Sequence, residues 1–179
     1  MRQIRGTTIL GIVRDGHAAM AGDGQVTLED TILRQAARKV RKMERGRVLV
    51  GYAGAAADAL ALFERFEDHL KRTRDDLRRA AAELAREWHS DRSLRRLDAE
   101  LAAVDRERAL LVTAQGDVVE SEDGVVAVGS GSIYALSACR ALIRHTSLGP
   151  AAVARESLLV AASLCVFTND QITIEEIHP

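Results

Sequence analysis

Apolar and polar positions follow a strand-like pattern over the first third of the chain. Residues 7–13 are apolar on both faces, which predicts a buried strand. The Asp-Gly pair that follows predicts a hairpin turn into a second strand over residues 17–21. Residues 26–32 alternate between apolar and polar, which predicts a half-buried strand. After a short basic segment, another strand is predicted over residues 48–53.

The pattern then changes to a helical period. Apolar residues recur at three- and four-residue spacing over residues 55–72 and 75–88, which predicts two helices that each have one apolar face. The other predicted elements are strands near residues 97–103, 109–113, 117–120 and 125–128, helices over residues 132–144 and 150–164, and a last strand over residues 172–177.

This order of elements predicts an α+β fold. Short turns between neighbouring strands imply antiparallel sheets, and each helical pair needs a sheet to cover its apolar face. The arrangement that satisfies both conditions is a four-layer αββα sandwich, with two antiparallel sheets between two helical layers. The chain shows no linker, repeat or low-complexity segment, so we expect a single domain.

Composition restricts the class of protein. A net charge of −1, with arginines interleaved by acids, argues against a nucleic-acid binder. No apolar run is long enough to span a membrane. Cys139 and Cys165 lie in apolar helical stretches and are typical of a reducing compartment. Because residues 1–6 contain no apolar core of a secretory signal, we expect a cytoplasmic protein.

The candidate chemistry begins at Gly6-Thr7-Thr8, where the first strand opens. A cut before Thr7 would give one residue both a hydroxyl nucleophile and a free α-amine. An α-amine has a reference pKa of about 8, far below the value of about 10.4 for lysine, so it accepts protons near neutral pH. This is the N-terminal-threonine form of nucleophilic catalysis. The alternative is two ordinary threonines at the head of a strand.

An ordered set of short segments resembles the HslV family of proteasome-like peptidases. The segments are Gly6–Ile9, Gly22–Gln25, Arg38–Arg41, Gly51–Gly54 followed by Ala57–Ala59, Gly129–Gly131, Cys165–Asn169 and Thr173–Ile177. Each is weakly specific alone, but together they cover nearly the whole chain from Thr7 onward. The resemblance implies an N-terminal-nucleophile hydrolase that cleaves peptide bonds. It also implies that residues 1–6 are a propeptide, removed on maturation, and that residues 7–179 are one peptidase domain.

The resemblance assigns five catalytic residues. Thr7 would be the nucleophile and its α-amine the general base. Lys39 would lie beside this amine, where a positive charge favours the neutral form, and Asp23 would pair with Lys39. Gly51 would offer its backbone N–H to the oxyanion, and Ser130 would hydrogen-bond the amine and relay its proton.

Each of these residues also has a purely structural explanation. Asp23 between two glycines is a common turn residue, and Lys39 lies among other basic residues as a surface charge would. Gly51 is explained by packing and Ser130 by a helix N-cap. Their joint occurrence at the family's spacing outweighs these separate explanations.

A sodium site and several partners also follow from the resemblance. Backbone carbonyls of Ala162, Cys165 and Thr168 would hold the ion near the end of the last predicted helix, where carbonyls lack intrahelical partners. The chain has no Gly-x-x-x-x-Gly-Lys-Ser/Thr loop for ATP. The resemblance therefore implies an HslU-type hexameric AAA+ ATPase that feeds unfolded proteins into a dodecamer of two stacked hexameric rings.

Two other functions stay open. An N-terminal-nucleophile amidase would act on small molecules without an ATPase, and a catalytically silent ring subunit would keep residues 1–6. Two features depart from the family's pattern. Six residues precede Thr7, so activity depends on a processing event, and residues 31–39 are richer in alanine and arginine than usual.

Overall fold

The computed structural model describes residues 4–179 except 93, 95, 96 and 98. The first half of the chain contains β1 (Ile4–Arg5), β2 (Thr8–Arg14), β3 (His17–Gly22), β4 (Val26–Leu28), β5 (Thr31–Arg34), β6 (Val40–Met43), the short helix η1 (Glu44–Gly46), β7 (Val48–Gly54), α1 (Ala56–Arg72) and α2 (Leu77–Ser90). The second half contains β8 (Ala99–Val104), β9 (Ala109–Val112), β10 (Val118–Glu120), β11 (Val125–Gly129), α3 (Ser132–His145), α4 (Pro150–Leu164) and β12 (Thr173–Ile177).

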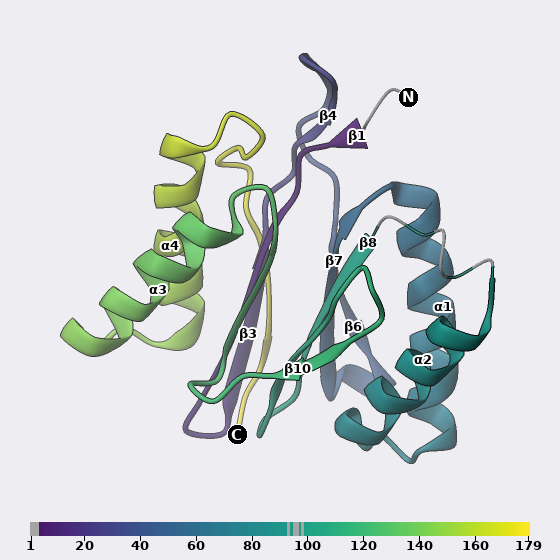
Figure 1. Ribbon diagram of the computed structural model, residues 1–179. Coiled ribbons are helices and arrows are strands. Elements are labelled where there is room, and N and C mark those ends of the chain that lie inside the picture. The colour runs from purple at the N-terminus through teal and green to yellow at the C-terminus, as the bar shows by residue number, and fades with distance from the viewer. Residues whose placement is uncertain (1–3, 93, 95–96, 98) are drawn as a thin grey trace.

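The elements form four layers, as the sequence predicts. One sheet has the strand order β10-β9-β8-β7-β6 and the other the order β11-β2-β3-β12, with antiparallel pairing throughout. Helices α1 and α2 cover the first sheet, and α3 and α4 cover the second (Figure 1). The αββα sandwich is therefore confirmed. Among the described residues, no helix is long and apolar enough to cross a membrane.

Three apolar clusters hold the layers together. Phe66 and Trp88 belong to the cluster under α1 and α2, Ile9 lies between the two sheets, and Leu10 faces α3 and α4. Because neighbouring strand residues point to opposite faces, β2 contributes to two clusters at once. This explains why residues 7–13 are apolar on both faces. Cys139 is buried under the α3–α4 layer, and its burial raises the pKa of its thiol to about 12.

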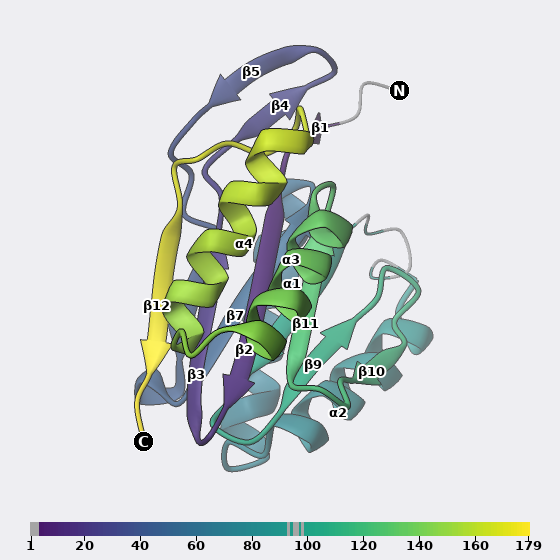
Figure 2. The same ribbon diagram turned by 90° about the vertical axis from the view of Figure 1, so that its left-hand side faces the viewer.

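The prediction of one strand over residues 26–32 is wrong. The chain turns at Glu29, which has a φ of 55°, and returns as β5. Strands β1, β4 and β5 form a small third sheet that stands above the sandwich (Figure 2). Ile32 and Leu33 are 50% and 52% exposed, because no layer formed by the described residues covers β5. The basic segment that follows contains a strand that the sequence pattern did not reveal, β6, at the edge of the five-stranded sheet.

Several strand ends meet at one end of the sandwich. The register places Thr8 opposite Gly129 and Ile9 opposite Gly22, so the start of β2 lies beside the ends of β3 and β11. Asp23 follows β3 directly, and its backbone N–H donates to the carbonyl of Thr8 at 3.1 Å. The fold thus brings the segments around residues 7, 23 and 129 together.

We predict that Leu62→Ala destabilises the protein by about 2–5 kcal/mol, because Leu62 is fully buried on the core face of α1 and truncation of its side chain leaves a cavity. Leu60→Ala on the same helix is the matched control, since Leu60 is half exposed. Denaturant unfolding measures both variants. Equal losses for the two would contradict the assignment of the core face of α1.

Candidate active site

Lys39 lies at the centre of a buried polar cluster at this end of the sandwich. Its side chain is 1% exposed, and its Nζ donates to Asp23 Oδ1 at 3.0 Å and to the carbonyl of Gly6 at 2.7 Å. A third hydrogen bond runs from Nζ to the carbonyl of Gln25. An ammonium has three donors, so this lysine is fully satisfied and held in one position.

Asp23 is fixed as firmly as its partner. Its Oδ1 also accepts from the backbone N–H of Thr8 at 2.7 Å. Its Oδ2 accepts from the N–H of Gln25 at 2.9 Å and, less closely, from the N–H of Asn169 at 3.3 Å. These backbone donors stabilise a carboxylate that is 0% exposed, and they tie its own turn to the start of β2 and to the loop after α4.

Burial dominates the electrostatics of Lys39. Desolvation lowers the pKa of the Lys39 ammonium below its ordinary value, and the charge and hydrogen bond of Asp23 oppose this shift. A buried cation without such a partner would be strongly disfavoured. The predicted pairing of Asp23 with Lys39 is therefore present in the structure, and it keeps a positive charge beside the segment around Thr7.

Thr7 and Lys39 share a hydrogen-bond partner, the carbonyl of Gly6. Thr7 Oγ1 donates to the carbonyl of Gly6 at 2.7 Å, so the hydroxyl of Thr7 and the ammonium of Lys39 converge on one carbonyl oxygen. Gly6 has a φ of +104°, and a Cβ at this position would lie 2.9–3.2 Å from atoms of Thr27 and Gln25. The chain thus makes a tight turn at the bond before Thr7 that only glycine fits.

The segment at residues 129–131 holds the first strand in place through its backbone. The N–H of Ser130 donates to the carbonyl of Thr7 at 2.9 Å, and Ser130 itself is exposed. The N–H of Gly131 donates to Thr8 Oγ1 at 3.0 Å, and this hydroxyl also pairs with Thr168 Oγ1 at 2.7 Å. Ser130 therefore lies next to Thr7 through its backbone, and the predicted role of its hydroxyl at the Thr7 amine stays a prediction.

Gly51 lies inside the five-stranded sheet, between Val40 and Ala102 in register. A Cβ on Gly51 would lie 2.6 Å from Ile9 Cγ2 and 3.0 Å from Met20 Sδ. The missing side chain therefore lets the two sheets approach closely. This contact supports the packing explanation for Gly51 and does not involve space for a substrate. The role of its N–H at an oxyanion stays a prediction.

Comparison with known proteins identifies the family. The family model described as proteasome subunit matches residues 4–177. The ATP-dependent protease subunit HslV of Chlorobium luteolum is 52% identical over 174 residues, which are 97% of this chain and 96% of that protein. The HslV of Syntrophobacter fumaroxidans is 51% identical over 97% of both chains. The chain belongs to the HslV branch of the proteasome family.

Solved structures agree with this assignment. The crystal structure of HslV from Trypanosoma brucei superposes with a TM-score of 0.91 at 37% identity, over 96% of this chain and 99% of that one. Thiobacillus denitrificans BPH, at 23% identity and a TM-score of 0.75, shares the fold. As a member of the HslV branch, the chain is a proteasome-type threonine peptidase.

The predicted cation ligands of this HslV-type chain lie around the end of α4. The carbonyl of Cys165 accepts from the N–H of Thr168 at 3.0 Å, which closes a turn directly after the helix. Ala162 is in the last turn of α4, where helix carbonyls lack intrahelical partners. The carbonyl of Val166 connects this turn to the cluster around Lys39, because it accepts from Gln25 Nε2 at 2.9 Å. Oxygen donors of this kind suit a hard monovalent cation.

Sequence reasoning gave no role to two residues that organise the site. Gln25 offers its carbonyl to Lys39 and its N–H to Asp23, and Asn169 Oδ1 accepts from the N–H of Gly24 at 3.0 Å. Both residues fall within segments that carry the family resemblance. Their signal was therefore present, but their contacts depend on chain segments far apart in sequence.

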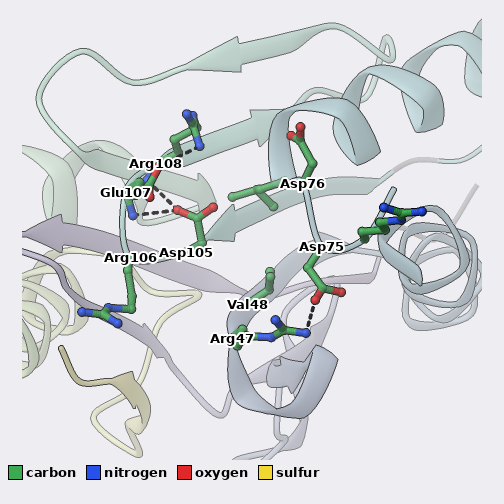
Figure 3. A pocket seen from close by; sticks show the side chains of 10 residues that line it. Arg47, Val48, Asp75, Asp76, Asp105, Arg106, Glu107 and Arg108 are labelled. Carbon is green, nitrogen blue, oxygen red and sulfur yellow. Dashed lines mark hydrogen bonds and ion pairs between the residues drawn. The ribbon is translucent and has the colours of Figure 1, made fainter. Parts of the chain in front are cut away.

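A pocket of about 360 Å³ lies elsewhere, at the opposite end of β7 and β8 (Figure 3). Several of its lining charges already have partners. Arg47 pairs with Asp75, and the carboxylate of Asp105 accepts from the backbone N–H groups of Glu107 and Arg108, both at 2.7 Å. This pocket brings together none of the residues around Thr7.

We predict that Asp23→Asn shifts the alkaline limb of peptidase activity to lower pH. The negative charge of Asp23 raises the pKa of Lys39, so its loss lowers that pKa further and Lys39 becomes neutral at lower pH. A pH profile of peptide cleavage for the wild type and this variant measures the shift. An unchanged alkaline limb in an active variant would contradict the role of the Lys39 charge.

Proposed function

We propose that this chain hydrolyses peptide bonds with Thr7 as an N-terminal nucleophile, after residues 1–6 have been removed. The observation that carries this proposal is the convergence of Thr7 Oγ1 and Lys39 Nζ on the carbonyl of Gly6, each at 2.7 Å. The reacting hydroxyl, a fixed cation and the bond to be cut are thus already together before processing.

The first reaction is cleavage of the chain itself. Thr7 Oγ adds to the carbonyl carbon of Gly6, and the ammonium of Lys39 stabilises the negative charge that forms on the carbonyl oxygen. The C–N bond then breaks, the nitrogen of Thr7 takes up the proton that the hydroxyl gave up, and an ester joins Gly6 to Thr7 Oγ. Water hydrolyses this ester, which releases the carboxylate of Gly6 and leaves Thr7 with a free hydroxyl and a free amine.

The mature site then repeats the chemistry on peptides. The α-amine of Thr7 accepts the hydroxyl proton as Oγ attacks the substrate carbonyl, and it returns a proton to the leaving amine. Lys39, held by Asp23, favours the neutral form of this amine. Gly51 contributes a backbone N–H to the oxyanion, and Ser130 relays the proton. Water completes the cycle by hydrolysing the acyl-enzyme.

We infer a structural sodium ion at the end of α4. The carbonyls of Ala162, Cys165 and Thr168 would hold it, and when bound it would neutralise the partial negative charge of the helix C-terminus. The same turn carries the hydroxyl of Thr168, which pairs with Thr8 Oγ1. The ion would thereby stabilise the position of Thr8 beside the nucleophile.

The partner that we propose is an HslU-type hexameric ATPase in the cytoplasm, acting with a dodecamer of this chain in two stacked rings. The relatives are named subunits of an ATP-dependent protease, yet this sequence has no ATP-binding loop. Ile133, Leu164 and Val166 on the α3–α4 layer are 67%, 59% and 80% exposed, which supports contacts between copies. An ATPase would supply unfolded proteins to the enclosed sites.

The small-molecule amidase and the silent subunit are not favoured, because protease subunits match nearly the full length of this chain.

We predict that Thr7→Ala abolishes cleavage of a fluorogenic peptide and leaves assembly intact, because it removes the hydroxyl that donates to the Gly6 carbonyl. Thr31→Ala, at an exposed threonine of β5, is the matched control and should retain full activity. Peptidase assays and size-exclusion chromatography test both variants. Activity of Thr7→Ala near the wild-type level would rule out this nucleophile.

A second prediction compares two lysines three residues apart. Lys39→Ala should reduce peptidase activity by at least about a hundredfold, because it removes the fixed cation at the site. Lys42→Ala should change activity less than twofold, since Lys42 is half exposed and pairs with Glu175 at 3.5 Å. Steady-state kinetics on a peptide substrate measure both. Equal effects would mean that the site is assigned to the wrong lysine.

A further inference from the structure

Three potential metal ligands lie on one face of the four-stranded sheet. The pairing of β12 with β3 places Glu176 opposite Ala19 and Ile177 opposite Ala18, so His178 follows opposite His17. Side chains two residues apart on a strand share a face. His17, Glu176 and His178 therefore project from the same side of this strand pair, where the C-terminal end of β12 meets the start of β3.

The side chains converge in the structure. His17 Nε2 lies 3.0 Å from Glu176 Oε2, and the rings of His17 and His178 have centroids 4.8 Å apart. One ligand atom from each of the three residues lies within 4.8 Å of the others. His17 and Glu176 are partly buried and His178 is exposed, so the cluster is held by the sheet and is open to solvent on one side.

We propose that these residues form a binding site for Zn²⁺. Two imidazoles and one carboxylate are a donor set that zinc accepts in three-ligand sites, with water in the fourth position. Zinc bonds of about 2.0–2.2 Å put tetrahedral ligand atoms about 3.4 Å apart, so a side-chain rotation of the exposed His178 completes the geometry. A simple ion pair would explain the contact between His17 and Glu176 alone. A bound metal also explains why His178 lies beside them.

The neighbouring cations, Arg14 and Lys42, pair with other carboxylates than Glu176. Arg14 of β2 is paired with His17 of β3, on the edge of β3 that faces away from β12. The guanidinium of Arg14 contacts Asp15 at 3.5 Å. Glu175, the next residue along β12, points to the opposite face and pairs with Lys42. Neither cation contacts Glu176 in the part of the chain that the structure describes.

The site is remote from the nucleophile. His17 begins β3 and Asp23 follows its end, so at about 3.3 Å per residue the two sites are roughly 20 Å apart. Zinc here would not take part in peptide hydrolysis. It would clamp the C-terminal strand to the hairpin that joins β2 and β3, and so stabilise the edge of the sheet.

The test is zinc binding by the full chain, stripped with a chelator, dialysed and titrated with Zn²⁺ against a chromophoric competitor. We expect one zinc per chain and a rise in the unfolding temperature when zinc is added. His17→Ala, Glu176→Gln and His178→Ala should each weaken binding at least about tenfold, the scale on which even outer-shell partners of metal ligands act. His89→Ala, at an exposed histidine of α2, is the matched control and should bind as the wild type does.

Substitution of Co²⁺ gives an independent readout, because its visible absorption reports the ligand set. His178→Ala removes an exposed side chain near the chain end, so it should keep the fold and the peptidase activity while it loses the metal. The proposal is overturned if the wild type binds no zinc at micromolar concentration. It is equally overturned if the three variants bind zinc as tightly as His89→Ala.

Discussion

The buried ion pair between Lys39 and Asp23 is the constraint on which the proposed active site depends. Two charges removed from water are stable only when every hydrogen bond is satisfied. Here the ammonium binds a carboxylate and two carbonyls, and the carboxylate binds three backbone N–H groups. Four segments of the chain are thereby held together: the stretch from Gly6 to Thr8 that includes Thr7, the turn after β3, the residue before β6 and the loop after α4.

The sandwich supplies the frame in which this pair is buried. The two sheets approach closely because Gly51 has no side chain against Ile9 and Met20. At Gly129 a Cβ would lie 2.0 Å from the carbonyl of Thr7, so only glycine permits the strand end to pass this close. The strand ends that pack closely against one another are the same strand ends that carry the residues of the site.

The sequence alone predicts most of this arrangement, but for different reasons in different places. Long helices such as α1 and α4 and the doubly apolar strand β2 have periodic patterns, which directly predict four layers. The resemblance assigned Thr7, Asp23 and Lys39, and the contact between the last two is present in the structure. The hairpin at Glu29 was missed because a turn of two acidic residues interrupts the alternation without a glycine or proline. The roles of Gln25 and Asn169 were missed because their contacts arise only when distant segments meet, and the packing role of Gly51 depends on side chains from the other sheet.

The central proposal is that the active molecule begins at Thr7. The N-terminal sequence and the intact mass of purified, peptidase-active protein test it most directly. We expect a chain that starts Thr-Thr-Ile and lacks the mass of residues 1–6. Active assemblies that still carry Met1–Gly6 on every chain would contradict it.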